Sequence, residues 1–270
     1  MTQGYVEAKE AFVDEIKVDE YIELEGSIRA YKQLEYSLER SLKMVLLFGK
    51  PGTGKTILLH RLYAQHKNKK DLHFIETPTG NRREFYDKLF TIFTGQKMPP
   101  NSTISFETFV AYGKKVKDER KIIILLDEAQ MYPTEMLEEI RILSDTGSIK
   151  FVISLHKTDN EDLMAKKHFQ SRIWETIELK NAELSEIRTY IHKRLLNQGL
   201  TEVANQLKDR HFKLIYRLTG GNMRECNKLL YTAFEIAEYY DKHHPAKLDY
   251  RRFPSKILEM AAIKTGMIHV

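Results

Sequence analysis

The alternation of apolar and polar residues divides this chain into a first part with strands and helices and a second part with helices only. Short runs rich in β-branched and other apolar residues predict the strands. The run at 121–126 is almost wholly apolar, which is typical of a central parallel strand covered by helices on both faces. The predicted strands are 44–48, 72–76, 121–126, 151–155 and 173–179.

Apolar residues that recur every three or four positions predict helices between these strands. Ile28, Leu34 and Leu38 show this spacing in the first helix. Because strands and helices alternate, we expect an α/β fold with a central five-stranded parallel sheet flanked by helices. The predicted helices of this part are 27–42, 57–63, 81–93, 106–116 and 133–143.

The strand pattern stops near residue 180, and this change in pattern indicates a domain boundary. Beyond it the spacing predicts helices over 184–196, 203–218, 222–239 and 255–263. The expected division has an N-terminal arm that packs on the core, an α/β core, an all-helical domain and a C-terminal tail. Their bounds are 1–27, 28–180, 181–240 and 241–270.

Composition narrows the class of protein only slightly. The chain has 270 residues, a formal net charge of +5 and a pI near 9.0, which is compatible with a nucleic-acid partner without indicating one. Its one cysteine, Cys226, excludes an intramolecular disulfide, fits a reducing cytoplasm and is expected to fill space in the core. The sequence shows neither a signal peptide nor an apolar run of transmembrane length. We therefore expect a cytoplasmic protein whose membrane contacts, if it has them, go through a partner.

The most specific motif is the sequence G-x-x-x-x-G-K-T at 49–56, between a predicted strand and a predicted helix. Strand, glycine-rich turn and helix form the context that a phosphate-binding P-loop requires. The glycines let backbone N–H groups face a phosphate, and the helix adds the partial positive charge of its N-terminus. Lys55 is expected to reach the β- and γ-phosphates, and Thr56 to offer its hydroxyl to Mg²⁺. The expected nucleotide-binding residues here are Gly49, Lys50, Pro51, Gly52, Thr53, Gly54, Lys55, Thr56 and Ile57.

Two carboxylates follow the central strand. Nucleotide sites in open α/β sheets lie at the carboxyl ends of the strands, so we expect Asp127 to face the P-loop and hold Mg²⁺ through water. Glu128 is then placed to polarise the water that attacks the γ-phosphate. The alternative is that both are polar residues that cap a helix after a buried strand.

With these motifs in place, the span 21–231 resembles AAA+ ATPases of the ExeA/GspA type, the A component of type II secretion. The transposition target-selection ATPases of the TniB/MuB kind are close relatives. The resemblance implies a P-loop AAA+ core, a helical lid over 181–240, binding of ATP or ADP with Mg²⁺, and a homo-oligomeric ring or filament. It rests on the segments Gly49–Thr56, Leu126–Gln130, Leu137–Leu143, Gln170–Ile173 and Gly220–Arg224.

The resemblance also implies roles for two arginines and one histidine. Arg172 resembles the arginine finger that reaches a nucleotide bound by a neighbouring subunit, and Arg224 resembles the sensor 2 arginine of the lid. A sensor 1 side chain is expected at the end of the strand 151–155, where secretion-type relatives have Gly-Gln. This chain has Leu155 and His156 there, so His156 is a candidate that departs from the pattern. In the alternative reading Arg172 is a surface arginine at a helix end, Arg224 is a salt-bridged arginine of the lid, and His156 is merely solvated.

Three functions remain open at this stage. The first is an ATP hydrolase that drives assembly or conformational change in a secretion, pilus or DNA-uptake machine, either in the cytoplasm or at the inner membrane through a protein partner. The second is ATP-dependent binding to duplex DNA, as in transposition. The third is a scaffold that binds ATP without turnover, against which Glu128 argues. The basic clusters that favour DNA are 67–70, 114–117, 166–167 and 251–252.

Overall fold

The computed structural model describes residues 4–15, 17–100, 102, 104–156, 172–248 and 250–268. The chain forms two compact units. Unit 1 comprises Met1–Ile28, Gly52–Gly54 and Lys180–Val270, and unit 2 comprises Arg29–Pro51 and Lys55–Leu179. Each unit contains a buried apolar cluster of its own.

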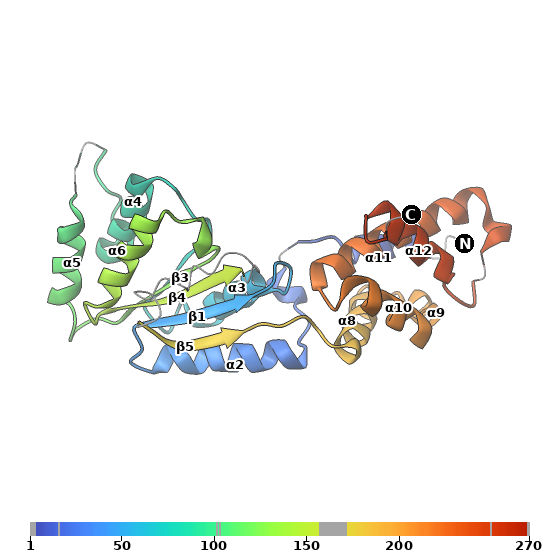
Figure 1. Ribbon diagram of the computed structural model, residues 1–270, viewed down its shortest axis with the longest axis horizontal. Coiled ribbons are helices and arrows are strands. Elements are labelled where there is room, and N and C mark those ends of the chain that lie inside the picture. The colour runs from blue at the N-terminus through green and yellow to red at the C-terminus, as the bar shows by residue number, and fades with distance from the viewer. Residues whose placement is uncertain are drawn as a thin grey trace. The chain divides into compact units, whose positions relative to one another are not determined.

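A parallel sheet forms the centre of unit 2 (Figure 1). Among the described residues its strand order is β2-β3-β4-β1-β5, and each neighbouring pair runs parallel. All five residues of β3 are buried, as expected for an apolar central strand. The five predicted strands are thus confirmed, with small shifts at their ends. Their bounds are β1 Met44–Gly49, β2 Leu72–Ile75, β3 Ile122–Leu126, β4 Ile149–His156 and β5 Ile173–Glu178.

Helices cover both faces of this sheet (Figure 1). Phe151 on β4 lies in the apolar cluster with residues of α4, α5 and α6. Its neighbour Lys150 reaches α2 on the opposite face, where α3 also packs. Asn81 caps α4 by accepting a hydrogen bond from Arg83 N, at 2.9 Å. The bounds are α2 Glu25–Glu39, α3 Lys55–His66, α4 Arg82–Thr94, α5 Phe106–Lys115, η2 Ala129–Met131 and α6 Thr134–Ser144.

The buried Lys150 ammonium holds the end of α2 against the sheet. Its Nζ donates hydrogen bonds to the carbonyl oxygens of Ser37, Leu38 and Arg40, at 2.6, 2.9 and 2.5 Å. These carbonyls lie at the C-terminus of the helix, where they have no partner within the helix and where a positive charge is favourable. Burial and the nearby Lys70 lower the pKa of Lys150 to about 8.

Unit 1 is helical, and its core is built around α11. Phe12, Phe234 and Phe253 are buried there together. Tyr5 belongs to the same cluster, and its hydroxyl donates a hydrogen bond to Gln206 Oε1 at 2.8 Å. The helices of this unit are α1 Tyr5–Glu10, η1 Val18–Glu20, α8 Leu184–Asn197, α9 Thr201–Gln206, α10 Asp209–Thr219, α11 Met223–His243, η4 Pro245–Lys247 and α12 Ser255–Lys264.

The N-terminal arm packs on the helices of unit 1, because Tyr5, Ala8 and Phe12 supply apolar surface to the cluster around α11. One expectation about this unit is wrong in detail. The helix expected over 203–218 is two helices. Leu207 adopts an extended conformation between them, yet its side chain stays buried, so the apolar periodicity continues across the break. None of the helices described in this chain has both the length and the apolar character that crossing a bilayer requires.

Candidate functional site

The P-loop has the local structure that its sequence predicts. β1 ends at Gly49 and α3 begins at Lys55, so a tight turn joins strand and helix. Gly52 and Gly54 have φ angles of 79° and 97°. Residues other than glycine rarely adopt these φ angles, so the two glycines are needed for the backbone conformation of the turn.

The ammonium group of Lys55 is held against this turn. The residue is 4% exposed, and its Nζ donates hydrogen bonds to the carbonyl oxygens of Gly49 and Lys50, at 2.9 and 3.1 Å. The two main-chain oxygens thus hold the ammonium group at the strand–helix turn. This is the position from which a lysine would meet a phosphate.

The carboxyl ends of β1, β4 and β3 meet along one edge of the sheet. β4 lies between the other two, and its last residue, His156, is in register with Gly49. Asp127 follows β3 directly and is 2% exposed. Its Oδ1 accepts a hydrogen bond from Glu128 N at 3.0 Å. The structure therefore places Gly49, His156 and the acidic pair at the same edge.

Glu128 has an unusual backbone conformation, and two neighbours contact its carboxylate. Its φ and ψ are 50° and 42°, and among the described residues no other non-glycine residue has a positive φ. Such a left-handed backbone costs about 1–2 kcal/mol. Gln130 Nε2 donates a hydrogen bond to Glu128 Oε2 at 2.6 Å, and His156 Nε2 lies 2.9 Å from Glu128 Oε1. Strain of this kind is found at functional sites more often than elsewhere.

The electrostatic environment favours the neutral form of His156. Burial lowers its pKa, and the nearby Lys55 ammonium lowers it further against the opposing effect of Glu128. A neutral imidazole with its proton on Nε2 donates a hydrogen bond to Glu128. His156 is therefore placed beside Glu128 and the P-loop lysine.

Two further residues near the acidic pair were not assigned roles from the sequence. Gln130 also accepts a long hydrogen bond from His156 N, at 3.4 Å, so it bridges Glu128 and β4. Tyr132 is buried, and among the described residues its hydroxyl has no hydrogen-bond partner. Burial and the charge of Asp127 raise the pKa of Tyr132. Nothing in the local pattern shows the contact between Gln130 and His156, because it joins residues brought together by the pairing of β3 with β4.

The oxygen ligands at this edge fit a magnesium ion bound together with a nucleotide. The hydroxyl of Thr56 and the carboxylate of Asp127 are hard donors of the type that Mg²⁺ prefers. Among the described residues no cluster of three or more His, Cys, Asp or Glu side chains could hold a metal unaided. Mg²⁺ commonly keeps several waters and takes phosphate oxygens as further ligands, so two protein oxygens suffice.

Both arginines with expected roles form ion pairs within their own units. In unit 2, Arg172 Nε lies 3.3 Å from Asp145 Oδ2, and Asp145 is also paired with Lys43 at 2.7 Å. In unit 1, Arg224 Nε lies 3.1 Å from Asp14 Oδ2, and both side chains are more than half exposed. These contacts show how the arginines are held in the isolated chain. Gln170 and Ser171, which precede Arg172 in the quoted motif, lie outside the described residues.

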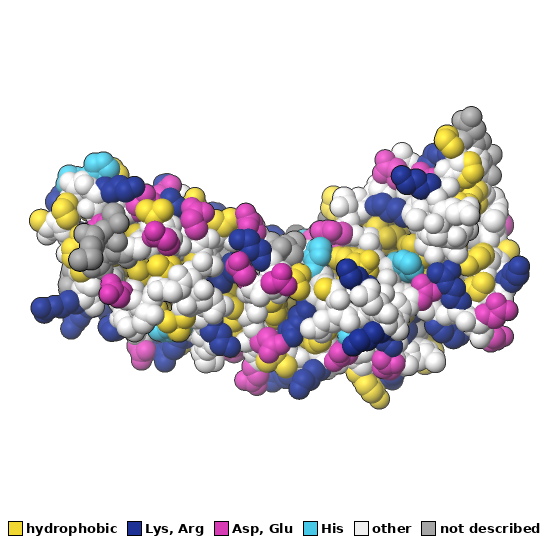
Figure 2. Space-filling view, turned by 180° about the vertical axis from the view of Figure 1, so that it is seen from behind, with side chains coloured by type: hydrophobic (Ala, Val, Ile, Leu, Met, Phe, Trp, Pro, Cys, Tyr) yellow, Lys and Arg dark blue, Asp and Glu magenta, His cyan; other side chains and the backbone are white. Residues whose placement is uncertain are grey.

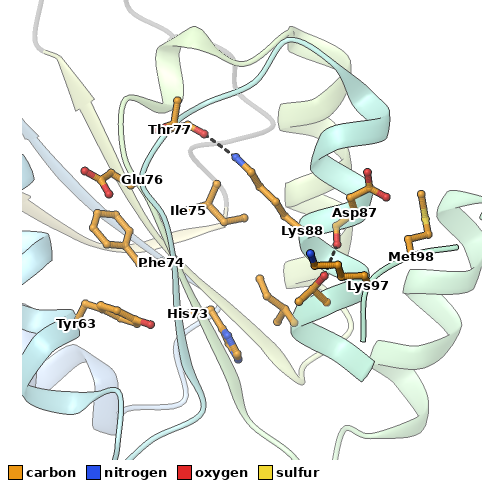
Figure 3. A pocket seen from close by; sticks show the side chains of 12 residues that line it. Tyr63, His73, Phe74, Ile75, Glu76, Thr77, Asp87, Lys88, Lys97 and Met98 are labelled. Carbon is orange, nitrogen blue, oxygen red and sulfur yellow. Dashed lines mark hydrogen bonds between the residues drawn. The ribbon is translucent and has the colours of Figure 1, made fainter. Parts of the chain in front are cut away.

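A separate cavity of about 640 Å³ lies beside the edge strand β2 (Figure 3). Its walls come from β2, from α4 and the loop after it, and from Tyr63 of α3. Its lining includes none of the P-loop residues and neither carboxylate of the acidic pair. It is therefore a different feature from the candidate nucleotide site.

Comparisons with known proteins agree with this geometry. Residues 39–164 match the family model of an AAA domain. The structure is similar to that of Cdc6p from Pyrobaculum aerophilum, with a TM-score of 0.67, 16% identity, and coverage of 95% of this chain and 70% of the other. It is also similar to the ORC2 protein of Aeropyrum pernix, solved with ADPNP and ADP, with a TM-score of 0.60, 18% identity, and coverage of 96% and 72%.

The RuvB Holliday junction branch migration motor of Thermotoga maritima is a third similar structure, with a TM-score of 0.52, 18% identity, and coverage of 94% and 73%. The chain has the AAA+ P-loop fold. At these identities the likeness establishes the AAA+ fold alone, and the expected fold class is confirmed. No curated protein matches the sequence.

Proposed function

We propose that this protein is an AAA+ ATPase that binds ATP and Mg²⁺ at residues 49–57 and hydrolyses ATP. The observation that supports this most directly is the row of contacts along the carboxyl edge of the sheet. Gly49 of the P-loop is in register with His156, and His156 contacts Glu128 at 2.9 Å. A phosphate-binding turn and a carboxylate able to accept a proton thus share one edge.

Each residue of the site has a distinct task in this proposal. Backbone N–H groups of the P-loop and the ammonium of Lys55 bind and orient the phosphates. Thr56 and Asp127 hold the metal, which when bound neutralises charge on the phosphate oxygens. Glu128 accepts the proton of the attacking water.

His156 and Gln130 serve Glu128 in this proposal. Both contact its carboxylate, so they fix the direction in which it faces a water molecule. Without these contacts the strained backbone of Glu128 would be free to relax away from the productive geometry.

Assembly completes the site in this proposal. Arg172 would leave its pair with Asp145 and reach the nucleotide of a neighbouring subunit, and Arg224 would contact the nucleotide bound to its own chain. A guanidinium suits both tasks because its planar fork matches phosphate oxygens. Both arginines have a carboxylate partner in the isolated chain, so ATP and a second subunit must compete with Asp145 and Asp14.

For the biological role we propose an assembly switch for a protein machine of the secretion, pilus or DNA-uptake kind, reached through a protein partner. Binding to duplex DNA is the second candidate. Figure 2 shows Lys and Arg side chains spread among acidic ones over the visible face. Lys166 and Lys167 lie outside the described residues. Lys70, in one of the basic clusters, is already paired with Glu39 at 2.7 Å. This mixture of charges gives duplex DNA no continuous basic surface on that face, so we place assembly first.

The test is ATP hydrolysis, measured as phosphate release, by the wild-type chain and by Glu128→Gln. We expect the wild type to turn over and Glu128→Gln to bind ATP with turnover reduced at least about a hundredfold, as is common when a positioned base is removed. Equal turnover by the two proteins would contradict the assigned role of Glu128. Measuring particle size with and without ATP and duplex DNA then separates the two candidate roles, because DNA binding should weaken steeply as salt rises.

A further inference from the structure

The outer edge of the sheet at β2 is open to another strand. β2 stands at the end of the strand order, and among the described residues it pairs only with β3. The carbonyl oxygens of Asp71 and Ile75 face β3, where they accept hydrogen bonds from Ile123 N and Asp127 N, at 2.8 and 3.3 Å. Because successive residues of a strand alternate, Phe74 between them presents its N–H and C=O to the outer side.

The cavity of about 640 Å³ lies along this edge (Figure 3). Its volume is within the range of about 300–1,000 Å³ that is usual for ligand-binding clefts. One wall is aromatic, because the rings of Tyr63 and Phe74 lie 5.9 Å apart, centroid to centroid. The other wall is formed by α4 and the residues that follow it. A groove bordered on one side by the outward-facing main-chain groups of an edge strand fits an extended backbone.

Charges inside the groove differ between its two walls. Glu76 lies next to the aromatic wall, and its Oε1 is 3.0 Å from His60 Nε2, within hydrogen-bond distance. On the α4 side, Lys88 extends toward β2 and donates a hydrogen bond to Thr77 O at 2.9 Å, whereas Asp87 points away from the strand (Figure 3). Lys97 lies on the same side. An ammonium with three donors is able to bind a carboxylate in addition to that carbonyl.

We propose that the β2 groove binds an extended acidic segment of a partner protein by strand addition. The backbone of the segment pairs with the outer edge at Phe74, one apolar side chain packs on Tyr63 and Phe74, and a carboxylate meets Lys88 and Lys97. Main-chain hydrogen bonds give such complexes their affinity, and the alternate side chains give them specificity. The surface is separate from the nucleotide site, so this proposal does not depend on ATP hydrolysis.

The test begins with a phage-displayed library of random peptides of about twelve residues, selected on the full-length wild-type protein. The best peptide is labelled, and its affinity is measured by fluorescence anisotropy. We expect it to contain an acidic residue among alternating apolar positions. Lys88→Met should weaken its binding about tenfold, as expected for a lost hydrogen bond to a charged group. The matched control is Lys69→Met, which removes an exposed lysine from the turn before β2 and should leave the affinity unchanged.

A second measurement tests the strand geometry without altering the protein. Single N-methyl groups are placed in turn along the selected peptide, so that each removes one main-chain donor. Strand addition predicts that methylation weakens binding at every second position and has little effect at the positions between. The proposal is overturned if no peptide is selected, if the selected peptide is insensitive to Lys88→Met, or if the N-methyl series lacks alternation. Displacement of the peptide by an oligothymidine of about twenty nucleotides would also overturn the proposal, because it would assign the groove to nucleic acid.

Discussion

The contact between Gln130 and Glu128 provides a sharp test of how the proposed catalytic base is positioned. The substitution Gln130→Met keeps the length of the side chain and removes its amide. It deletes the 2.6 Å hydrogen bond to Glu128 Oε2 and the weaker 3.4 Å contact with His156 N. Nothing else about the carboxylate is changed, because His156 still contacts Oε1.

The magnitude follows from the type of hydrogen bond. A hydrogen bond to a charged group contributes about 1.5–3 kcal/mol. Since about 1.4 kcal/mol corresponds to a factor of ten in rate, complete loss of positioning would lower kcat about 10- to 150-fold. His156 retains part of the geometry, so we expect a fall near the lower end, about tenfold.

Steady-state phosphate release at fixed protein concentration measures this effect. The expected result is a lower kcat with KM changed less than about twofold, because Gln130 contacts the base and no P-loop residue. The matched control is Met131→Gln, since Met131 is the next residue and is 64% exposed. An unchanged kcat in Gln130→Met, or an equal fall in the control, would refute the positioning role.

Three other predictions concern distinct parts of the chain. Lys150→Met should lower the free energy of unfolding by about 2–4 kcal/mol, because three hydrogen bonds to the end of α2 are lost and each contributes about 0.5–1.5 kcal/mol. Urea denaturation measures this loss, and an unchanged midpoint would show that these hydrogen bonds do not stabilise the fold. Burial lowers the pKa of His211 to about 4 from an ordinary 6.5. The free energy of unfolding should therefore keep its full value above pH 6.5 and decline as the pH falls toward 4. In His211→Gln, the part of this decline that is due to His211 should be absent. Arg172→Ala should lower turnover while leaving the ATP affinity of a single chain nearly intact. If turnover per chain of the wild type did not change on dilution, an arginine finger acting between subunits would be contradicted.

The sequence was sufficient to predict the strands and the P-loop because both depend on local patterns. The run at 121–126 is apolar throughout, and its buried strand appears as expected. The glycines at 52 and 54 stand where the turn needs positive φ. In each case the residues that determine the structure are neighbours along the chain, so their spacing contains the information.

The contacts around Glu128 could not be predicted in the same way. His156 lies 28 residues from Glu128 in sequence, and only the strand order β3-β4-β1 brings the two together. The positive φ of Glu128 is equally hidden, because glutamate has no preference for that conformation. Sequence spacing cannot show such contacts, since they depend on the register of strands that are distant along the chain.

Packing between remote segments accounts for the other differences. The sequence predicts an N-terminal arm that packs on the core, but it does not show that Tyr5 and Phe12 bury their rings beside Phe234 of α11. The open edge at β2 also depends on strand order, which the sequence does not specify. Apolar residues show that a segment is buried, and they do not show which surface covers it.

Binding of ATP with Mg²⁺, measured by isothermal titration calorimetry on three proteins, tests the central claim most directly. Wild type and Glu128→Gln should bind one ATP per chain with similar affinity, whereas Lys55→Ala, which removes the buried ammonium from the phosphate-binding turn, should show no measurable binding. If Lys55→Ala bound ATP as tightly as the wild type, or if the folded wild type bound none, the P-loop would not be the nucleotide site and the proposed function would be wrong.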